Sequence, residues 1–168
     1  GEPLVIQEKP HLPTFSGTSK DASYGRWKWE VNNLKEGGSY KNATIMDAIR
    51  KSLKSPAADV LTQLGVNPSL DKVLKKMTSL YGSVLSGPAI MEKFYTESQG
   101  GSTVAQWSIT LEDWLYQAAE KEAVPVETIP DTLKHKFWSG LVEDKIKGSL
   151  RYRYKELDFE DLVAEARS

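Results

Sequence analysis

Two shortages limit the chemistry available to this chain: it has no cysteine, and only two of its 168 residues are histidine. The absence of cysteine excludes disulfide bonds, thiol nucleophiles and every zinc site built on cysteine ligands. A histidine-based metal or acid–base site would need both His11 and His135. We therefore expect no metal and no cofactor, and the lack of cysteine fits a reducing, cytoplasmic setting.

The chain also lacks long apolar runs and recognisable catalytic motifs. No apolar run approaches the roughly 20 residues of a membrane-spanning helix, so we expect no membrane span. No phosphate-binding GxxxxGK[ST] or GxGxxG segment and no GxSxG nucleophile turn occurs. Glu112-Asp113 and Glu160-Asp161 are neighbouring acids, which point in different directions on a helix, and we interpret them as solubility features. The sequence thus predicts a protein that is not an enzyme.

Charge is distributed unevenly, although the net charge is only −1. Residues 1–84 contain 12 Lys and Arg against 8 Asp and Glu, whereas residues 85–168 contain 10 against 15. The first half is therefore basic and the second acidic. This difference suggests two lobes, with contacts between unlike lobes of neighbouring molecules; a solvated surface without such a role is the default alternative.

The most regular segment covers residues 103–121. Its apolar residues recur at steps of three or four, as on one face of a helix: Val104, Trp107, Leu111, Trp114, Leu115 and Ala118. Thr103 and Gln106 have the spacing of a capping box, in which each side chain bonds a free backbone N–H of the first turn. We expect this helix to form the core of the second half.

Shorter periodic segments predict eight more helices and no sheet. The first covers about residues 22–35, with Trp27, Val31 and Leu34 facing inward. We expect Asn42 to cap the second helix, Pro56 to begin the third, Ser69 to open the fourth and Asp158 to cap the last. We also expect Leu80 and Tyr81 of the fourth helix, Tyr95 of the fifth and Ile146 of a helix over 143–154 to face inward.

The segment Gly82–Pro88 contains two glycines and a proline, and it is the expected linker. The predicted organisation is an extended arm over residues 1–14, a lobe of four helices over 15–84 and a lobe of five helices over 85–168. The apolar side chains Leu4 to Ile6 of the arm need a groove or edge to cover them, and Phe15 is expected to act as an apolar plug.

Aromatic and basic residues supply the candidate contact sites. Phe137 and Trp138 are adjacent, so both cannot face one core, and an exposed tryptophan is typical of a protein interface. Trp29 likewise lies off the apolar face of its helix. The run RYRYK places Arg151, Arg153 and Lys155 beside tyrosines, which is suited to stacking on bases and binding phosphates. A helix end with favourable dipole interactions is the alternative interpretation of that run.

Four segments occur in an order that carries a family resemblance: LPTFSG (12–17), YGRWKWEVNNL (24–34), IMDAIRKSLKSPAADVLTQL (45–64) and LDKVLKKMTSLYG (70–82). Their Phe-x-Gly opening, aromatic helix, Leu…Pro-Ala junction and Leu-Tyr-Gly end resemble the Gag capsid protein of gypsy-type LTR retrotransposons. The likeness extends to domesticated host descendants of the paraneoplastic Ma antigen and Arc type. The helix over 103–121 stands where the helix of the major homology region would be.

The resemblance implies a two-lobe retroviral-type capsid fold and a structural protein that self-assembles into oligomers or virus-like shells. The N-terminal lobes would form rings, using Trp29. The C-terminal lobes would pair through the Pro130–Leu141 helix, using Lys134, His135 and Trp138. No CCHC zinc knuckle is present, so RNA packaging would depend on a region absent from this fragment. The protein would be cytoplasmic and released in virus-like particles.

Two other functions remain open. A domesticated capsid lobe can act as a non-assembling adaptor that binds partner peptides in an apolar groove, which the arm at Leu4–Ile6 would occupy or mimic. An RNA-binding protein would use RYRYK and the lysine-rich face at Lys72, Lys75 and Lys76, and its binding would weaken steeply with salt. Concentration-independent monomers that bind peptides would favour the adaptor.

Overall fold

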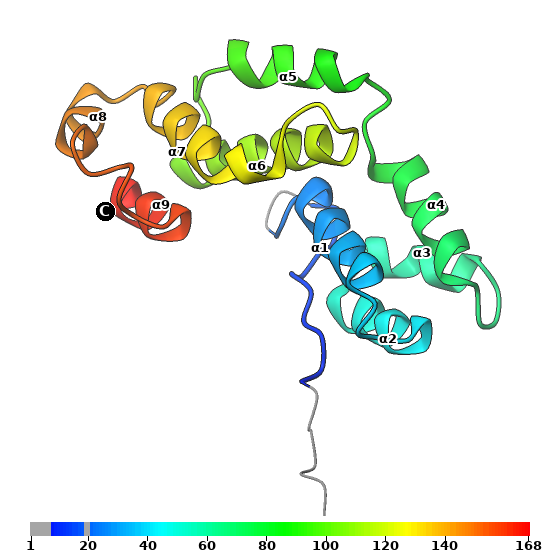
Figure 1. Cartoon of the computed structure of the whole chain (residues 1–168). Helices are drawn as coiled ribbons and strands as arrows, with labels where there is room; N and C mark the ends of the chain where they lie inside the picture. Colours follow the sequence, from blue (N-terminus) through cyan, green and yellow to red (C-terminus); the bar gives the residue numbers. More distant parts are fainter. Residues whose placement is uncertain (1–7, 19–20) are drawn as a thin grey trace, which may run out of the picture. The chain divides into compact units, whose positions relative to one another are not determined.

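The structure, a computed structural model, describes residues 8–18 and 21–168. Its regular elements are α1 (Tyr24–Gly37), α2 (Asn42–Ser52), α3 (Ala57–Gln63), α4 (Leu70–Tyr81), α5 (Gly87–Thr96), α6 (Val104–Glu120), the 3-10 turn η1 (Val126–Thr128), α7 (Ile129–Ser139), α8 (Asp144–Leu150) and α9 (Phe159–Arg167). These ranges contain no strand, and one isolated parallel bridge joins Phe15 to Leu53. The predicted all-α class is confirmed, with four helices before the linker and five after it (Figure 1).

The chain divides into two compact units. Unit 1 contains residues 1–22 and 27–81, and unit 2 contains residues 23–26 and 82–168. The first turn of α1 thus groups with the later helices, which helix periodicity cannot reveal. The predicted arm, its lobes over 15–84 and 85–168 and the capsid-type arrangement stay predictions. Leu4 to Ile6 lie outside the described residues.

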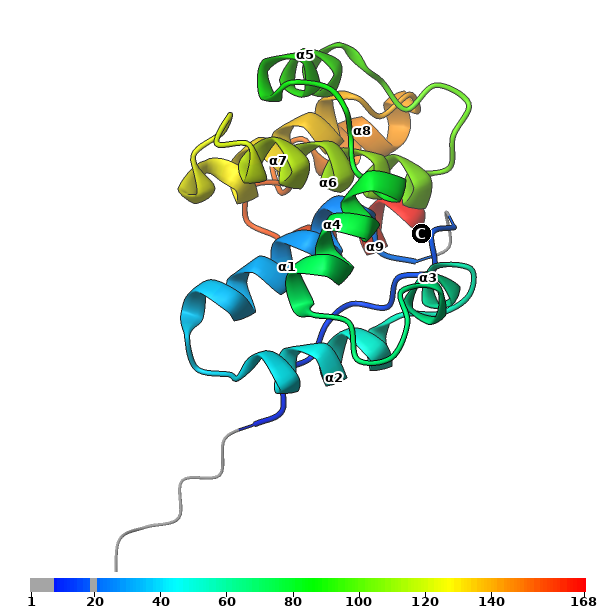
Figure 2. The same ribbon diagram turned by 90° about the vertical axis from the view of Figure 1, so that its right-hand side faces the viewer.

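Unit 1 is built around Phe15, which is buried and packs against the rings of Trp27 and Tyr81. The Phe15 N–H donates to the Ser52 carbonyl, and the Phe15 carbonyl accepts from Lys54, so this extended segment is fixed at the end of α2. Gly17 follows with φ of +87°, and a Cβ there would lie 2.8 Å from the Tyr81 ring. Glycine therefore allows the close approach. Elsewhere in the unit, α4 packs on α2 and α3 (Figure 2).

Unit 2 is organised around α6, against which α5, α7 and α9 pack (Figure 1). The predicted capping box is present: Thr103 Oγ1 accepts from the Gln106 N–H, and the Gln106 side chain accepts from the Thr103 N–H. Trp107 is buried and donates through Nε1 to the Phe137 carbonyl at 3.0 Å. Of the predicted inward residues, Trp107, Leu111, Leu115 and Ala118 are buried, whereas Val104 and Trp114 are half-buried. The predicted α6 core is therefore confirmed in its central turns.

Several predicted helix ends were wrong in detail. Lys41 is the N-cap of α2, so Asn42 is its first helical residue, and Pro56 is the N-cap of α3 rather than its first residue. Asp158 does occupy the N-cap of α9 but makes no side-chain capping bond. A polar residue near a helix start predicts the turn well, yet an adjacent residue can take the cap position.

Some predicted inward residues are also exposed. Leu80 and Tyr95 are 50% and 58% exposed, although Tyr81 and Phe94 beside them pack inward, because adjacent helix positions point in different directions. Ile146 is half-buried, and α8 ends at Leu150 instead of continuing to Tyr154. Within the described residues, no helix is long and apolar enough to cross a membrane.

Candidate functional site

The predicted contact residues of the second half lie on α7, away from its core-facing side. Leu133 and Phe137 are buried in unit 2, and the next residue in the chain, Trp138, is half-buried. This confirms that the adjacent aromatic pair does not share one core. His135 is exposed and Lys134 is half-buried on the same helix. Lys134, His135 and Trp138 thus lie beside the buried Leu133 and Phe137 on α7, and their role in a contact stays a prediction.

Trp138 belongs to an aromatic cluster, which we define as His135, Trp138 and Tyr154. The Trp138 and Tyr154 rings stack with centroids 4.7 Å apart and an interplanar angle of 6°. The His135 ring lies 6.3 Å from Trp138 and 6.2 Å from Tyr154, measured between centroids. Tyr154 is buried, so it forms the inner part of the cluster and His135 the outer part.

The indole of Trp138 has further partners on α8. Its Nε1 donates to the Lys147 carbonyl at 2.8 Å, and the Lys147 ammonium lies 5.4 Å from the centre of the Trp138 ring. That ammonium also donates to the Ser139 carbonyl at 2.8 Å. A tryptophan can be half-buried at little cost when its indole N–H has a hydrogen-bond partner. Trp138 is therefore a structural link between α7 and α8 as well as a surface residue.

Basic residues surround the aromatic cluster. The Lys155 ammonium lies 5.9 Å from the centre of the Tyr154 ring, and Lys134 Nζ donates to the Lys155 carbonyl at 3.4 Å. Arg151 is exposed and lines an open pocket of about 310 Å³ with Trp138, Lys147, Gly148 and Asp144. The structure thus brings Arg151 and Lys155 beside the predicted α7 contact residues.

Arg153, the third basic residue of the predicted nucleic-acid contact, forms an ion pair with α9 instead. It donates to the Glu165 carboxylate of α9 at 2.7 Å. Trp29, the residue predicted to contact other copies in the first half, lies half-buried on α1 in unit 1.

The outer side of the aromatic cluster, with the exposed His135 ring beside the cations Arg151 and Lys155, is suited to contact an anion or another protein. Among the described residues, no group of His, Asp and Glu is arranged to hold a metal ion.

Sequence reasoning missed the role of Tyr154. It lies in the turn over 151–156 that follows α8, where no periodicity indicates which side chains point inward. The alternation of arginine and tyrosine in RYRYK was the only available signal. It indicated that some of these side chains pack while others face solvent, but it did not identify the partner.

Sequence reasoning also misjudged the acids of α6, which are more than solubility features. Asp113 Oδ1 accepts from the Gly25 N–H and from Gln117 Nε2, both at 2.9 Å. Gln117 Oε1 accepts in turn from the Ser83 N–H at 2.7 Å. Lys121 Nζ, one turn further along, donates to the carbonyls of Ser83 and Leu85. These α6 residues hold the first turn of α1 and the start of the linker within unit 2.

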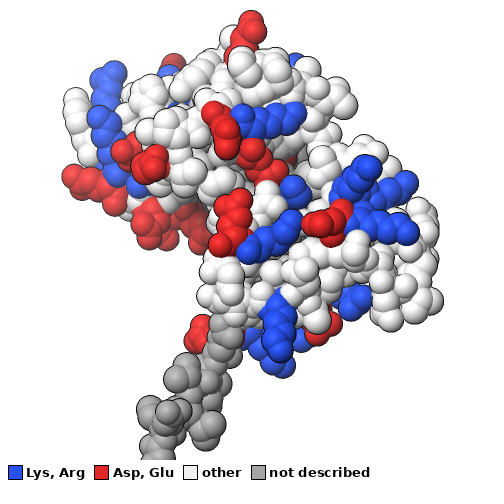
Figure 3. Space-filling model, turned by 45° about the vertical axis from the view of Figure 1, so that its right-hand side comes forward, with Lys and Arg blue, Asp and Glu red and all other residues white. Residues whose placement is uncertain are grey.

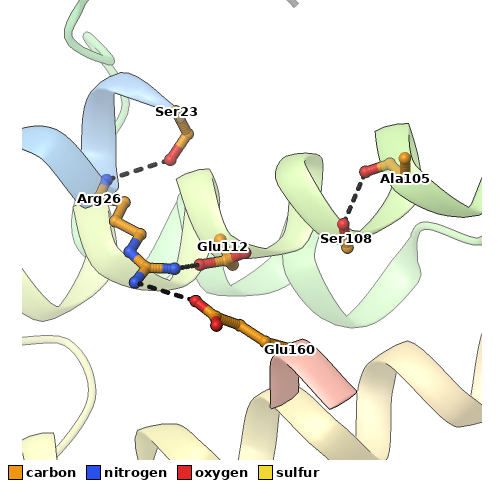
Figure 4. Close-up of polar contacts among 6 residues, drawn as sticks. All are labelled: Ser23, Arg26, Ala105, Ser108, Glu112 and Glu160. Atoms are coloured by element: carbon orange, nitrogen blue, oxygen red, sulfur yellow. Dashed lines mark hydrogen bonds and ion pairs between the residues drawn. The ribbon is translucent and has the colours of Figure 1, made fainter. Parts of the chain in front are cut away.

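Glu112 has a different partner, as expected for adjacent helix positions. Its carboxylate accepts from Arg26 at 2.7 Å, and the second terminal nitrogen of Arg26 lies 3.9 Å from Glu160 (Figure 4). Burial raises the pKa of Glu112, and the Arg26 charge opposes that rise. Burial likewise raises the pKa of Asp113, against the hydrogen bonds from Gly25 and Gln117. These carboxylates bind backbone, amide and guanidinium groups.

Comparisons with known proteins add nothing to these observations: no known family matches the chain, and no curated protein matches it.

Proposed function

We propose that this protein is a capsid-like structural protein that self-assembles through repeated copies of its helical lobes. The order of the four sequence motifs supports this function, and so does the succession of four helices, a linker and five helices. The observation that carries the proposal is the α7 face. It presents exposed His135 beside Trp138, which is half-buried and so keeps part of its ring accessible.

The proposed contact pairs α7 with the same helix of a second copy. Such a two-fold interface is isologous, so each residue of the patch meets its own equivalent or a near neighbour. Lys134, Lys147 and Arg151 would then approach the same cations of the partner. Like charges repel less as salt screens them. Self-association through this face should therefore strengthen with salt, whereas binding of RNA should weaken with salt.

The intramolecular contacts of Trp138 determine how the contact must be tested. Replacing Trp138 by alanine removes the stack on Tyr154 and the hydrogen bond to Lys147, so it changes α7–α8 packing as well as any interface. His135 is exposed, and its ring forms the outer edge of the aromatic cluster, 6.3 Å from Trp138 and 6.2 Å from Tyr154 between centroids. His135→Arg therefore changes the outer surface and these two edge contacts but keeps the Trp138–Tyr154 stack.

The experiment is light scattering coupled to size exclusion, over a range of protein and salt concentrations. The wild-type protein should form a concentration-dependent series of oligomers. His135→Arg should raise the concentration needed about tenfold, which corresponds to about 1.4 kcal/mol. Thr96→Arg adds the same charge at an exposed α5 position and is the matched control. A strict monomer at every concentration and salt level would contradict the proposal.

Packaging of RNA is proposed for a separate nucleic-acid-binding module, within virus-like particles that form in the cytoplasm. The basic residues of this chain are divided between its two units. Arg153 pairs with Glu165 in unit 2, and the exposed Lys72 and Lys75 of α4 lie on unit 1, where Lys and Arg side chains gather in Figure 3. If this chain alone bound RNA and the binding weakened steeply with salt, an RNA-binding function would be favoured over the structural one.

The second candidate function is a non-assembling adaptor that binds peptides. A specific observation favours it: unit 2 contains a partly apolar pocket between α6, α7 and α9. Monomers that bind peptide without forming oligomers would select this function over self-assembly.

A further inference from the structure

The pocket between α6 and the N-terminal ends of α7 and α9 has an apolar floor. Its volume is about 390 Å³, and all of its lining belongs to unit 2. Ile129 and Leu133 lie buried at its base, and Tyr116 and Phe159 are half-buried along its sides. The Phe159 ring is held edge-on against Phe137 at 5.5 Å between centroids. The floor is thus a rigid apolar surface large enough for one or two side chains.

The rim of this pocket carries an excess of carboxylates. Its four acidic residues are Glu112, Asp158, Glu160 and Asp161, and its two cations are Arg26 and Lys134. The single Arg26 guanidinium serves two of these acids, at 2.7 Å from Glu112 and 3.9 Å from Glu160 (Figure 4). Lys134 donates to the Lys155 carbonyl. The carboxylates of Asp158 and Asp161 make no ion pair among the described residues, so the rim favours an incoming positive charge.

The raised pKa of Glu112 agrees with the excess of carboxylates at the rim. Burial is the main cause that raises its pKa, and Glu160 raises it further, whereas Arg26 lowers it. A second cation at the rim would offset the repulsion between Glu112 and Glu160. A nucleic acid or an anionic lipid surface would instead add negative charge beside these carboxylates, which disfavours both as occupants.

We propose that this pocket binds a peptide segment of a partner protein that carries apolar residues followed by Lys or Arg. The apolar side chains of the bound peptide pack on Leu133, Tyr116 and Phe159. The Lys or Arg of the peptide pairs with Glu160 and Asp161. This inference goes beyond self-assembly, because the pocket and the proposed self-association contact lie at different ends of α7. The first turns of α7 line the pocket, and the aromatic cluster lies near the C-terminal end of the helix. It gives the adaptor function a site and a partner chemistry.

The test uses fluorescence anisotropy with a fluorescein-labelled, end-capped peptide, Ser-Leu-Phe-Lys-Arg-Gly. Two control peptides replace Lys-Arg by Glu-Glu or Leu-Phe by Ser-Ser. Wild-type protein should bind the first peptide and bind each control at least about tenfold more weakly, since apolar burial and charge pairing both contribute. Affinity for the first peptide should fall several-fold between about 50 and 300 mM salt. Equal binding of the Ser-Ser peptide would overturn the pocket, because surface charge alone would then explain binding.

Protein variants locate the site. Glu160→Gln with Asp161→Asn removes two exposed rim charges, and Glu92→Gln with Glu122→Gln removes two exposed charges elsewhere in unit 2. The first pair should weaken binding about tenfold, and the second should leave it unchanged. Equal effects of the two pairs, or no binding by the wild type at millimolar protein, would overturn the proposal.

Two further controls separate this inference from self-assembly. All anisotropy measurements use protein at a concentration where light scattering shows monomers, and His135→Arg should bind the peptide normally. Amide chemical shifts on titration should change around residues 112–116, 129–134 and 158–161. Changes confined instead to residues 72–76 or to the aromatic cluster would overturn the assignment of the site. Self-capture of a second copy would appear as loss of binding with rising protein concentration and would also contradict a separate partner.

Discussion

Asp113 offers the sharpest test of how α6 holds the chain in unit 2. One oxygen, Oδ1, accepts both the Gly25 N–H and Gln117 Nε2, each at 2.9 Å. Asp113→Ala removes this acceptor and leaves the Gly25 N–H without it, in a place where a Cβ on Gly25 would collide with the Asp113 carbonyl. Water has little room there. An unsatisfied buried donor costs about 1–3 kcal/mol, and this is the expected loss of unfolding free energy.

Asp113→Asn separates the hydrogen bonds from the charge. Its amide oxygen keeps both donors, whereas the buried negative charge is gone. Burial raises the pKa of Asp113, so the folded protein holds the proton more tightly than the unfolded chain does. The stability contributed by this group is therefore full below the unfolded pKa of about 4 and is lost as pH rises through the raised folded pKa. At neutral pH the asparagine variant should be at least as stable as the wild type.

The assay is urea unfolding of the three proteins, monitored by tryptophan fluorescence, at neutral pH and near the unfolded carboxyl pKa of about 4. Hydrogen exchange of the Gly25 amide gives a local readout. The alanine variant should lose stability and exchange this amide faster, and the asparagine variant should do neither. If alanine and asparagine are equally stable at neutral pH, the hydrogen bonds to Asp113 contribute nothing and the reasoning is refuted.

The contacts of unit 2 give three more predictions. Gly140→Ala should cost about 1–3 kcal/mol in a thermal melt, because its Cβ would collide with the Trp107 ring, whereas Gly101→Ala, in open space, should cost little. Glu112→Gln should flatten the pH dependence of unfolding in urea, because the raised pKa of Glu112 makes the wild type lose stability as pH rises through it. Trp138→Phe keeps a ring on Tyr154 but loses the bond to Lys147, so urea denaturation should show a loss of about 0.5–1.5 kcal/mol.

The helices were predictable because their signals are local. The capping box at Thr103 and Gln106 and the apolar spacing of α6 depend on residues within two turns of one another, and both are present. Leu80 and Tyr95 failed for the opposite reason. Each lies next to a residue of the same last turn that does pack, Tyr81 and Phe94, and adjacent helix positions point in different directions. Which residue of the pair faces inward depends on contacts far away in the sequence.

In the candidate site, too, features that depend on neighbouring residues could be predicted and those that depend on distant residues could not. The adjacency of Phe137 and Trp138 predicted one outward aromatic residue, because two neighbouring helix positions cannot face one core. The stack of Trp138 on Tyr154 could not be predicted, since it depends on the path of the turn over 151–156. The α6 acids were misjudged because their partners, Gly25 and Arg26, are far away in the sequence.

These misjudged residues show that α6 has two roles. Its apolar residues form the core of unit 2. Asp113, Gln117 and the C-cap residue Lys121 recur at steps of four, which places them in one row along the helix and its end. That row binds the chain at residue 25, before it continues into unit 1, and at residues 83–85, after it returns. Because Gln117 contacts both Asp113 and Ser83, the two segments share one hydrogen-bond network. Three groups of the predicted linker, the Ser83 N–H and the carbonyls of Ser83 and Leu85, are thus bound by the side chains of Gln117 and Lys121.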